Sequence, residues 1–315
     1  MAIAGAVISR GPDVPVSRCA GGPWSPRDVS SVEGRPVVIF DTSAINWLTD
    51  DAERLPLMSG IKAGFWFRLN GDSFGELVAT TDSARRKALL EVSKLLVTAG
   101  DCLLPHDELL KEAVKQHAAG GKFDWRAVPV RCKEYEVEIA RQEFINDDIS
   151  NEQRHFAREV GNGFSEIYEG ARPAFQELLR KHGSAPLDLD ELVHALQTQA
   201  GAFWSMASGL YSRPSGLNIN EGAARDFVDA CPPFRALLIA LCLAQHRRCI
   251  EDPQHKSAGA FDLYGSVYLP YCAQFVTADQ GQQEALIHVA SLAELGVEVC
   301  SYADFRVRLL GLRGA

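Results

Sequence analysis

The chain has 315 residues, of which 46% are hydrophobic, and its formal net charge is −9. A polypeptide of this length and composition can bury a substantial core in one or two domains. The negative charge excludes a protein that coats nucleic acid by bulk electrostatic attraction, so any such contact must be local.

Eight cysteines are scattered along the chain and form no C-x-x-C pair. This spacing indicates neither a zinc knuckle nor a disulfide framework. It suits a reducing compartment, so we expect a cytoplasmic protein. The longest apolar run, residues 234–243, is about half as long as a membrane span, and we therefore expect no membrane association.

The N-terminal 35 residues are rich in Gly, Pro and Ser without periodicity, which predicts an irregular arm over residues 1–35. Residues 36–40 then form a continuous apolar run, as expected for a central strand that is buried on both faces. Asp41 follows directly, and Thr42 or Ser43 is the expected cap of a helical turn. Asp41 is thus predicted at the carboxyl end of a strand, where open parallel sheets bind ligands.

Strand and helix signals alternate up to residue 104. A strand candidate over residues 64–69 is followed by a turn and a helix that carries Glu76 on its first turn. A longer amphipathic helix is expected over residues 83–98, and a short buried strand over residues 102–104. Residues 36–104 therefore read as the first half of an α/β domain with a parallel sheet.

Residues 105–249 show a different rhythm, because strand signals almost vanish. Glycines and prolines separate long helical patterns, which predicts an all-helical insertion into the α/β domain that could bind a protein partner or inhibitor. The expected helices cover residues 107–119, 130–160, 164–182, 187–210, 221–230 and 234–249.

The second half of the α/β domain is expected over residues 250–315. Apolar positions recur every four residues from 263 to 271, which predicts a helix whose other side carries Asp262 and which Pro270 ends. A short strand over residues 275–277 leads to Asp279, and one more helix and strand follow. If the first strand and this one share a parallel sheet, Asp41 and Asp279 lie in the same crevice.

Four acids are therefore candidates for a common site: Asp41, Glu76, Asp262 and Asp279. Carboxylates that lie close together repel one another, so they either take up protons or bind cations. Oxygen-only ligands select hard ions such as Mg²⁺ or Mn²⁺, and two such ions suit the hydrolysis of a phosphodiester. Each acid also has an ordinary explanation, since it can cap a helix, favour the positive end of a helix or pair with a lysine.

Three stretches, FDTSAIN, SFGELVATTDSARRKALLEVSKLL and FDLYGSVYLPYCAQFVTAD, resemble the three blocks of the PIN-domain family of nucleases. The resemblance covers residues 36–104 and 257–305. It implies a three-layer α/β/α fold with a parallel sheet and an acidic metal site that cleaves RNA. Family members act as toxins of bacterial toxin–antitoxin pairs or in RNA processing and decay.

On this resemblance, Asp41, Glu76, Asp262 and Asp279 match the four metal-binding acids, and Ser43 and Thr277 match hydroxyls that steady the site. The sequence departs from the family pattern in two places. Ala273 stands where relatives often carry another acid, and Gln280 where they often carry a lysine. We therefore expect one tightly held ion, with a second ion joining alongside the substrate.

Three other functions can be compared with that of a metal-dependent endoribonuclease. A haloacid-dehalogenase phosphatase is excluded, because Ser43 stands where that motif needs a second aspartate. Two E-x-x-H pairs, Glu152 with His155 and Glu191 with His194, could hold a di-iron centre in the helical insertion, although solvated helix faces explain them more simply. A non-catalytic scaffold that binds RNA or a protein partner through the insertion is the third reading.

Overall fold

Strand β2 (Arg35–Phe40) is the centre of the sheet in the computed structural model. The structure describes residues 30–98, 101–120, 123–127, 131–132, 173, 175–177, 180, 188–198, 201–247 and 263–311. Val37 and Ile39 point into the hydrophobic core on one face of the sheet, and Val38 and Phe40 into the core on the other. The prediction of a central strand that is buried on both faces is confirmed.

The other main strands are parallel to β2. Strands β3 (Trp66–Arg68) and β6 (Gln274–Thr277) pair with its two edges, and β7 (Glu298–Ser301) pairs with β6. Strand β4 (Asp101–Cys102) continues the sheet beyond β3 through a parallel bridge between Leu69 and Cys102. The parallel order is therefore β4–β3–β2–β6–β7. Successive strands are added on one side of β2 up to β4 and on its other side from β6, so the strand order switches between β2 and β6.

The hairpin at the start of the described chain corrects one prediction. Strand β1 (Ser31–Val32) pairs antiparallel with the beginning of β2, through a turn in which Glu33 and Gly34 have φ values of 51° and 74°. Positive φ at both central residues is typical of tight hairpin turns. Residues 31–35 are thus not irregular, but a strand of two residues is too short to show periodicity.

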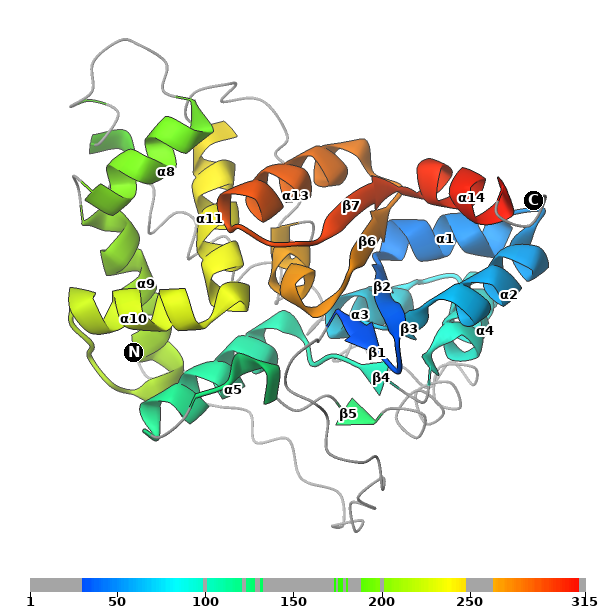
Figure 1. Ribbon diagram of the computed structural model, residues 1–315, viewed down its shortest axis with the longest axis horizontal. Coiled ribbons are helices and arrows are strands. Elements are labelled where there is room, and N and C mark those ends of the chain that lie inside the picture. Colours follow the sequence, from blue (N-terminus) through cyan, green and yellow to red (C-terminus); the bar gives the residue numbers. More distant parts are fainter. Residues whose placement is uncertain are drawn as a thin grey trace.

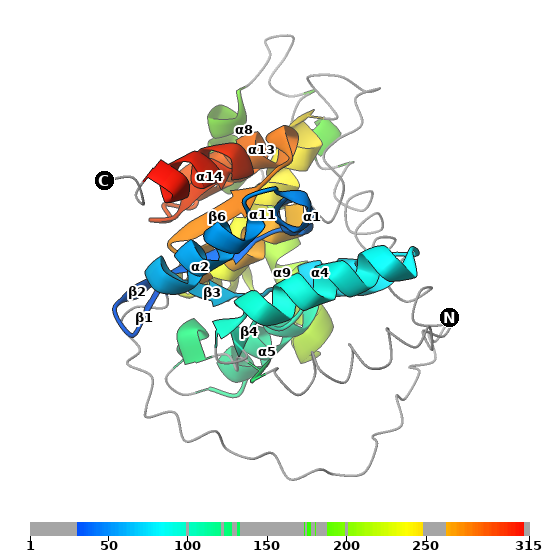
Figure 2. The ribbon, with the colours of Figure 1, turned by 90° about the vertical axis from the view of Figure 1, so that its right-hand side faces the viewer.

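One face of the sheet is covered by helices that come from both ends of the chain. These are α1 (Thr42–Asp50), α2 (Arg54–Gly64), α3 (Gly71–Ala79), α4 (Ser83–Leu96) and α14 (Tyr302–Gly311). Figure 2 views the molecule from this side, with α1, α2 and α4 in front of the strands. The predicted helices after residues 73 and 83 are confirmed. Helix α2 was not predicted, although Pro56 lies in its first turn, where proline is tolerated.

The opposite face is covered by α13 (Gln280–Leu292), by the 3₁₀ helix η4 (Gly265–Tyr271) and by a group of further helices. This group contains α5 (His106–Ala118), α8 (Leu189–Thr198), α9 (Ala202–Ser215), α10 (Glu221–Ala230) and α11 (Pro232–His246). In Figure 1 they stand beside the sheet, with α11 against α13. A single apolar cluster runs from Val37 and Phe275 into this group, so the sheet and these helices share one core.

Three details differ from the predictions for residues 105–271. The helix expected over residues 187–210 is two helices, because Gly201 adopts the left-handed conformation with φ of 59°. Strand β5 (Arg131–Cys132) pairs antiparallel with β4, so the insertion is not entirely helical. The turn before β6 is 3₁₀ rather than α, and Pro270 lies inside it instead of ending it.

Most of residues 133–187 lie outside the described residues, and with them the helices expected over residues 130–160 and 164–182. In the described part, Cys102, Cys231, Cys242, Cys272 and Cys300 are all buried and none of them forms a disulfide. No single helix there is long and apolar enough to cross a membrane, although α10 and α11 reach that length together across a bend of 110°.

Candidate functional site

Asp41 lies where β2 ends and α1 begins. Its backbone N–H donates to the carbonyl of Val276 at 3.0 Å, which ties it to β6. Its side chain is the N-cap of α1, because Oδ1 accepts a hydrogen bond from the N–H of Ala44 at 2.7 Å. The cap is therefore Asp41 itself and not Thr42 or Ser43 as expected. The carboxylate is only 8% exposed and is held by the backbone turn.

Two hydroxyls connect the ends of β2 and β6 around this carboxylate. Ser43 Oγ lies 2.8 and 2.9 Å from the Asp41 oxygens, and Thr277 Oγ1 donates to Asp41 Oδ2 at 2.8 Å. Each hydroxyl also accepts a backbone N–H, Ser43 from Ala278 and Thr277 from Asp279. The structure thus brings Thr277 to Asp41 and Ser43, from which it is more than 230 positions distant in the sequence.

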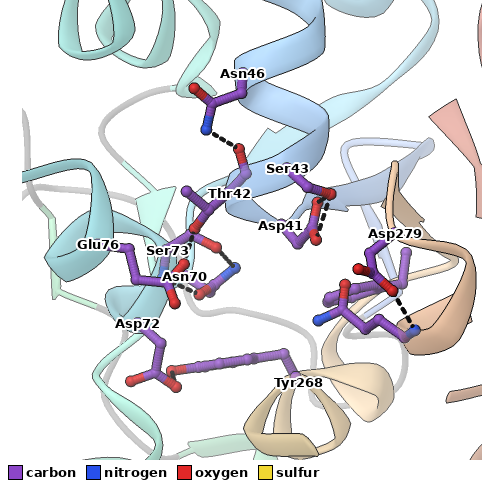
Figure 3. A pocket seen from close by; sticks show the side chains of 13 residues that line it. Asp41, Thr42, Ser43, Asn46, Asn70, Asp72, Ser73, Glu76, Tyr268 and Asp279 are labelled. Carbon is purple, nitrogen blue, oxygen red and sulfur yellow. Dashed lines mark hydrogen bonds between the residues drawn. The ribbon is translucent and has the colours of Figure 1, made fainter. Parts of the chain in front are cut away.

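Asp279 follows β6 and lines the same opening. It is the N-cap of α13, and its Oδ1 accepts from the N–H of Gln282 at 2.7 Å. The side chain is exposed, in contrast to Asp41. Figure 3 shows Asp41 and Asp279 across the pocket from Glu76 and Asp72. Both aspartates are therefore helix caps, and both stand at the carboxyl ends of neighbouring parallel strands.

Glu76 reaches the site from α3. Asn70 caps this helix by accepting from the N–H of Ser73 at 2.7 Å, as its turn sequence predicted. The cap fixes α3 beside the end of β2, since the Asn70 amide also donates to the carbonyl of Phe40. Thr42 Oγ1 donates to Glu76 Oε2, which orients this carboxylate toward the first turn of α1.

Asp72 is a site residue that the sequence analysis missed. It lies four positions before Glu76 on α3, so both carboxylates are on one helical face, and this spacing could have revealed it. His106 Nδ1 lies 2.9 Å from Asp72 Oδ2, and Tyr268 donates its hydroxyl to the same oxygen at 2.8 Å. Burial and the neighbouring Asp72 carboxylate raise the pKa of Tyr268, so its hydroxyl keeps the proton that it donates.

These residues line a single cavity of about 270 Å³ at the reversal point between β2 and β6. Four carboxylates face it, and no Lys, Arg or His stands among the described residues of its wall. Those residues are Asp41, Thr42, Ser43, Asn46, Asn70, Asp72, Ser73, Glu76, Gly265, Tyr268, Phe275, Asp279 and Gln282. The fourth predicted acid, Asp262, lies outside the described residues.

The donor set of this cavity consists of carboxylate, hydroxyl and amide oxygens, which fits Mg²⁺ or Mn²⁺ better than a soft metal. As they stand, however, no three His, Cys, Asp or Glu side chains in the described residues converge closely enough to hold an ion. Each carboxylate accepts from its own neutral or histidine donor instead.

The two E-x-x-H pairs do not gain support as a di-iron site. Glu191 and His194 are both exposed on α8. Glu191 forms a reciprocal cap with Asp188, in which each side chain accepts the backbone N–H of the other residue. Helix capping therefore accounts for Glu191. The other pair, Glu152 and His155, lies outside the described residues.

Comparisons of the chain with protein-family models, with curated proteins and with solved structures found no match. The chain is mixed α/β with a mostly parallel sheet, and the interpretation of its site rests on the residues themselves.

Proposed function

We propose that this chain is a metal-dependent endoribonuclease of the PIN type, with Mg²⁺ or Mn²⁺ held by the carboxylates of the β2–β6 cavity. One observation carries the proposal. Asp41 and Asp279 are 238 positions apart (279 minus 41), yet they follow adjacent parallel strands and face the same cavity as Glu76 and Asp72. Helix capping explains an aspartate at each of these two positions, but it does not require four carboxylates to face one cavity.

The arrangement of the sheet supports this proposal. The parallel strands, in the order β4–β3–β2–β6–β7 and with helices on both faces, are compatible with the three-layer α/β/α architecture that the PIN resemblance implies. In this order the reversal point lies between β2 and β6, which is where open α/β sheets place their ligands. On this reading the helices of residues 105–249 are an insertion that packs on one face.

The protein residues have separable roles in this mechanism. Asp41, Glu76, Asp279 and the predicted Asp262 would hold the cation, which supplies a water of lowered pKa and neutralises charge on the phosphate. Ser43 and Thr277 hold the Asp41 carboxylate in one orientation through hydrogen bonds of 2.8 to 2.9 Å. Hydrogen bonds to a metal-binding carboxylate fix the orientation in which its oxygens bind the ion.

The separation of the carboxylates favours one alternative, a non-catalytic scaffold. No described trio converges on an ion, and a large helical segment shares the core of the sheet. Such a scaffold would bind RNA or a protein partner, for example an antitoxin-like inhibitor, through α5 and α8 to α11. A scaffold would be indifferent to metal, whereas an active site requires it.

The test is incubation of the purified chain with total cellular RNA and Mn²⁺ or Mg²⁺, followed by mapping of the new RNA ends. We expect cleavage that EDTA stops and that Asp41→Asn and Asp279→Asn abolish. Leu217→Ala, at an exposed position outside the cavity, is the matched control and should cleave normally. Cleavage by the double aspartate variant at the parent rate would overturn the proposal.

A further inference from the structure

Trp47 is exposed beside the acidic cavity. Its side chain is 60% accessible on α1, whereas Trp66, Trp125 and Trp204 are each at most 8% accessible. Tryptophan is on average one of the more buried residues, so an open indole ring has a cost in water. Aromatic rings in such positions mark surfaces that bind a partner.

The helical repeat places Trp47 at the rim of the cavity. Ser43 and Trp47 are four positions apart, so their side chains are neighbours on one face of α1. Ser43 Oγ contacts the Asp41 carboxylate, and Asn46, the residue before Trp47, lines the cavity wall. One helical turn, about 5.4 Å along the axis, therefore separates the backbone of Trp47 from that of Ser43, which holds Asp41. A neighbouring nucleotide of an extended strand can span this distance.

A buried tyrosine supports the ring from α14. The ring centroids of Trp47 and Tyr302 are 6.1 Å apart, with an angle of 53° between the planes. Tyr302 is itself held, because its hydroxyl donates to Asp51 Oδ2 at 3.0 Å. The indole is thus positioned by the fold and does not need to be ordered when a ligand binds, which favours affinity.

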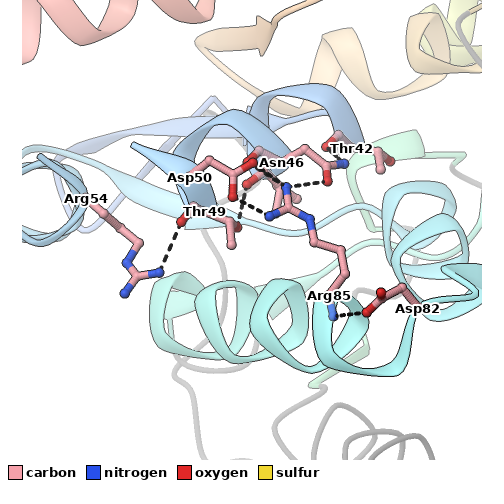
Figure 4. A network of polar contacts seen from close by, with 8 residues as sticks. Thr42, Asn46, Thr49, Asp50, Arg54, Asp82 and Arg85 are labelled. Carbon is pink, nitrogen blue, oxygen red and sulfur yellow. Dashed lines mark hydrogen bonds and ion pairs between the residues drawn. The ribbon is translucent and has the colours of Figure 1, made fainter. Parts of the chain in front are cut away.

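Two arginines bind polar groups in the C-terminal part of α1 and at its C-cap. Arg85 donates to the carbonyl of Asn46 at 3.1 Å and pairs with Asp50, as Figure 4 shows. Arg306 donates to Asp51, the C-cap, at 2.7 Å. The two arginine side chains are 29% and 35% exposed. Each is already neutralised by an aspartate, so we assign the affinity of this surface to the ring rather than to charge.

We propose that Trp47 stacks on an unpaired base of a single-stranded RNA whose neighbouring phosphodiester enters the acidic cavity. This inference rests on the proposed nuclease function and names the form of its substrate. A chain with net charge −9 and a cavity lined by carboxylates repels phosphates, so its substrate affinity must come largely from uncharged contacts. Base stacking supplies such contacts, tolerates any sequence, and requires a base that is not paired in a duplex.

The experiment measures binding of a short single-stranded RNA in EDTA, where no cleavage occurs, by quenching of tryptophan fluorescence. Because the other described tryptophans are buried, we expect quenching in the parent chain and its loss in Trp47→Phe. Fluorescence anisotropy of a labelled RNA should show an affinity about 5-fold to 100-fold lower for Trp47→Ala. Trp47→Phe keeps a ring and should retain most of the affinity, and Leu217→Ala should match the parent.

A duplex of the same length completes the design, since its bases cannot stack on Trp47. We expect Trp47→Ala to leave duplex binding unchanged. Equal affinity of the parent and Trp47→Ala for single-stranded RNA, or no binding by the parent, would overturn the inference. These results are distinct from failure of the nuclease proposal, because cleavage is measured separately with Asp41→Asn. Loss of binding in Trp47→Ala without any cleavage by the parent would leave this surface standing and remove only the nuclease.

Discussion

Two aspartates of the sheet are almost equally buried but have opposite surroundings. Asp101, at the start of β4, is 4% exposed and receives the guanidinium of Arg68 and the indole N–H of Trp66 at 2.7 to 2.8 Å. Asp41, at the end of β2, is 8% exposed and receives hydroxyls and a backbone N–H in a wall of further carboxylates. The fold therefore neutralises the charge of Asp101 with Arg68. The carboxylates of the cavity, including Asp41, lie together at one edge of the sheet.

This difference separates an acid that is held in an ion pair from an acid that is proposed to bind a cation. A buried ion pair is costly to break but contributes little when it is replaced as a whole, so Arg68 and Asp101 matter for folding. Carboxylates gathered around a cavity repel one another and destabilise the fold unless a cation joins them. The two regions should consequently respond in opposite ways to substitution, and the following experiments exploit that contrast.

The largest effect is expected at Asp41. Asp41→Asn should lower the cleavage rate by about 10³-fold, because the cation and its water contribute several kcal/mol to the transition state. The amide oxygen of asparagine still caps α1, so the free energy of unfolding should change by less than about 1 kcal/mol. RNA cleavage assays and urea unfolding measure the two quantities. A variant that unfolds much more easily would show that Asp41 is structural, like Asp101.

Arg68→Met should give the opposite pattern. The substitution leaves the Asp101 carboxylate buried without its guanidinium, which costs about 3–5 kcal/mol of unfolding free energy. Urea unfolding monitored by circular dichroism measures the loss. The double variant Arg68→Met with Asp101→Leu removes the whole pair and should recover much of the stability. If Arg68→Met is as stable as the parent, the contrast between the two regions fails.

Divalent cations should stabilise the folded chain only by binding in the cavity. At a Mn²⁺ concentration 100 times the Kd, binding adds about 2.7 kcal/mol to the unfolding free energy, which appears as a rise in Tm. Asp41→Asn and Asp279→Asn should lose this rise. Glu298→Gln removes an acid outside the cavity wall, where it pairs with Arg308, and should keep the rise. An equal shift in all the variants would place the ion elsewhere.

A smaller effect is expected from the hydroxyl that holds Asp41. Thr277→Val keeps the shape of a buried side chain but removes the hydrogen bonds to Asp41 and Asp279. Loss of a hydrogen bond to a metal-binding residue typically lowers metal affinity or activity by 10-fold to 100-fold. Thr277→Ser retains the hydroxyl and is the matched control. Mn²⁺ titration of both variants measures the difference, and equal affinities would show that the hydroxyl serves packing only.

The sequence predicted the parts of the site that follow strands. Asp41 and Asp279 each come directly after a short apolar run, and a strand that ends in an acid can be recognised without coordinates. Asp72 escaped notice because its turn sequence was already explained by the cap at Asn70. Its place in the cavity is defined by contacts with His106 and Tyr268, which are distant in the chain.

The length over which hydrophobic residues recur periodically also decided which helices and strands could be predicted. Helix α4 has enough turns for its apolar face to be read, and its prediction is confirmed. Strands β1 and β5 have two residues each, so they have no readable alternation, and both were missed. The break at Gly201 was missed because a single glycine inside a helical pattern is often tolerated.

The close approach at Gly71 has a mechanical consequence. A Cβ atom on Gly71 would lie 2.4 Å from the backbone nitrogen of Pro105, so the start of α3 rests directly on the chain that leads into α5. Asp72 and His106, the next residue on each side, carry this junction into the cavity wall. A displacement of α5 would therefore reach the acidic cavity through the Gly71–Pro105 contact and the hydrogen bond between Asp72 and His106.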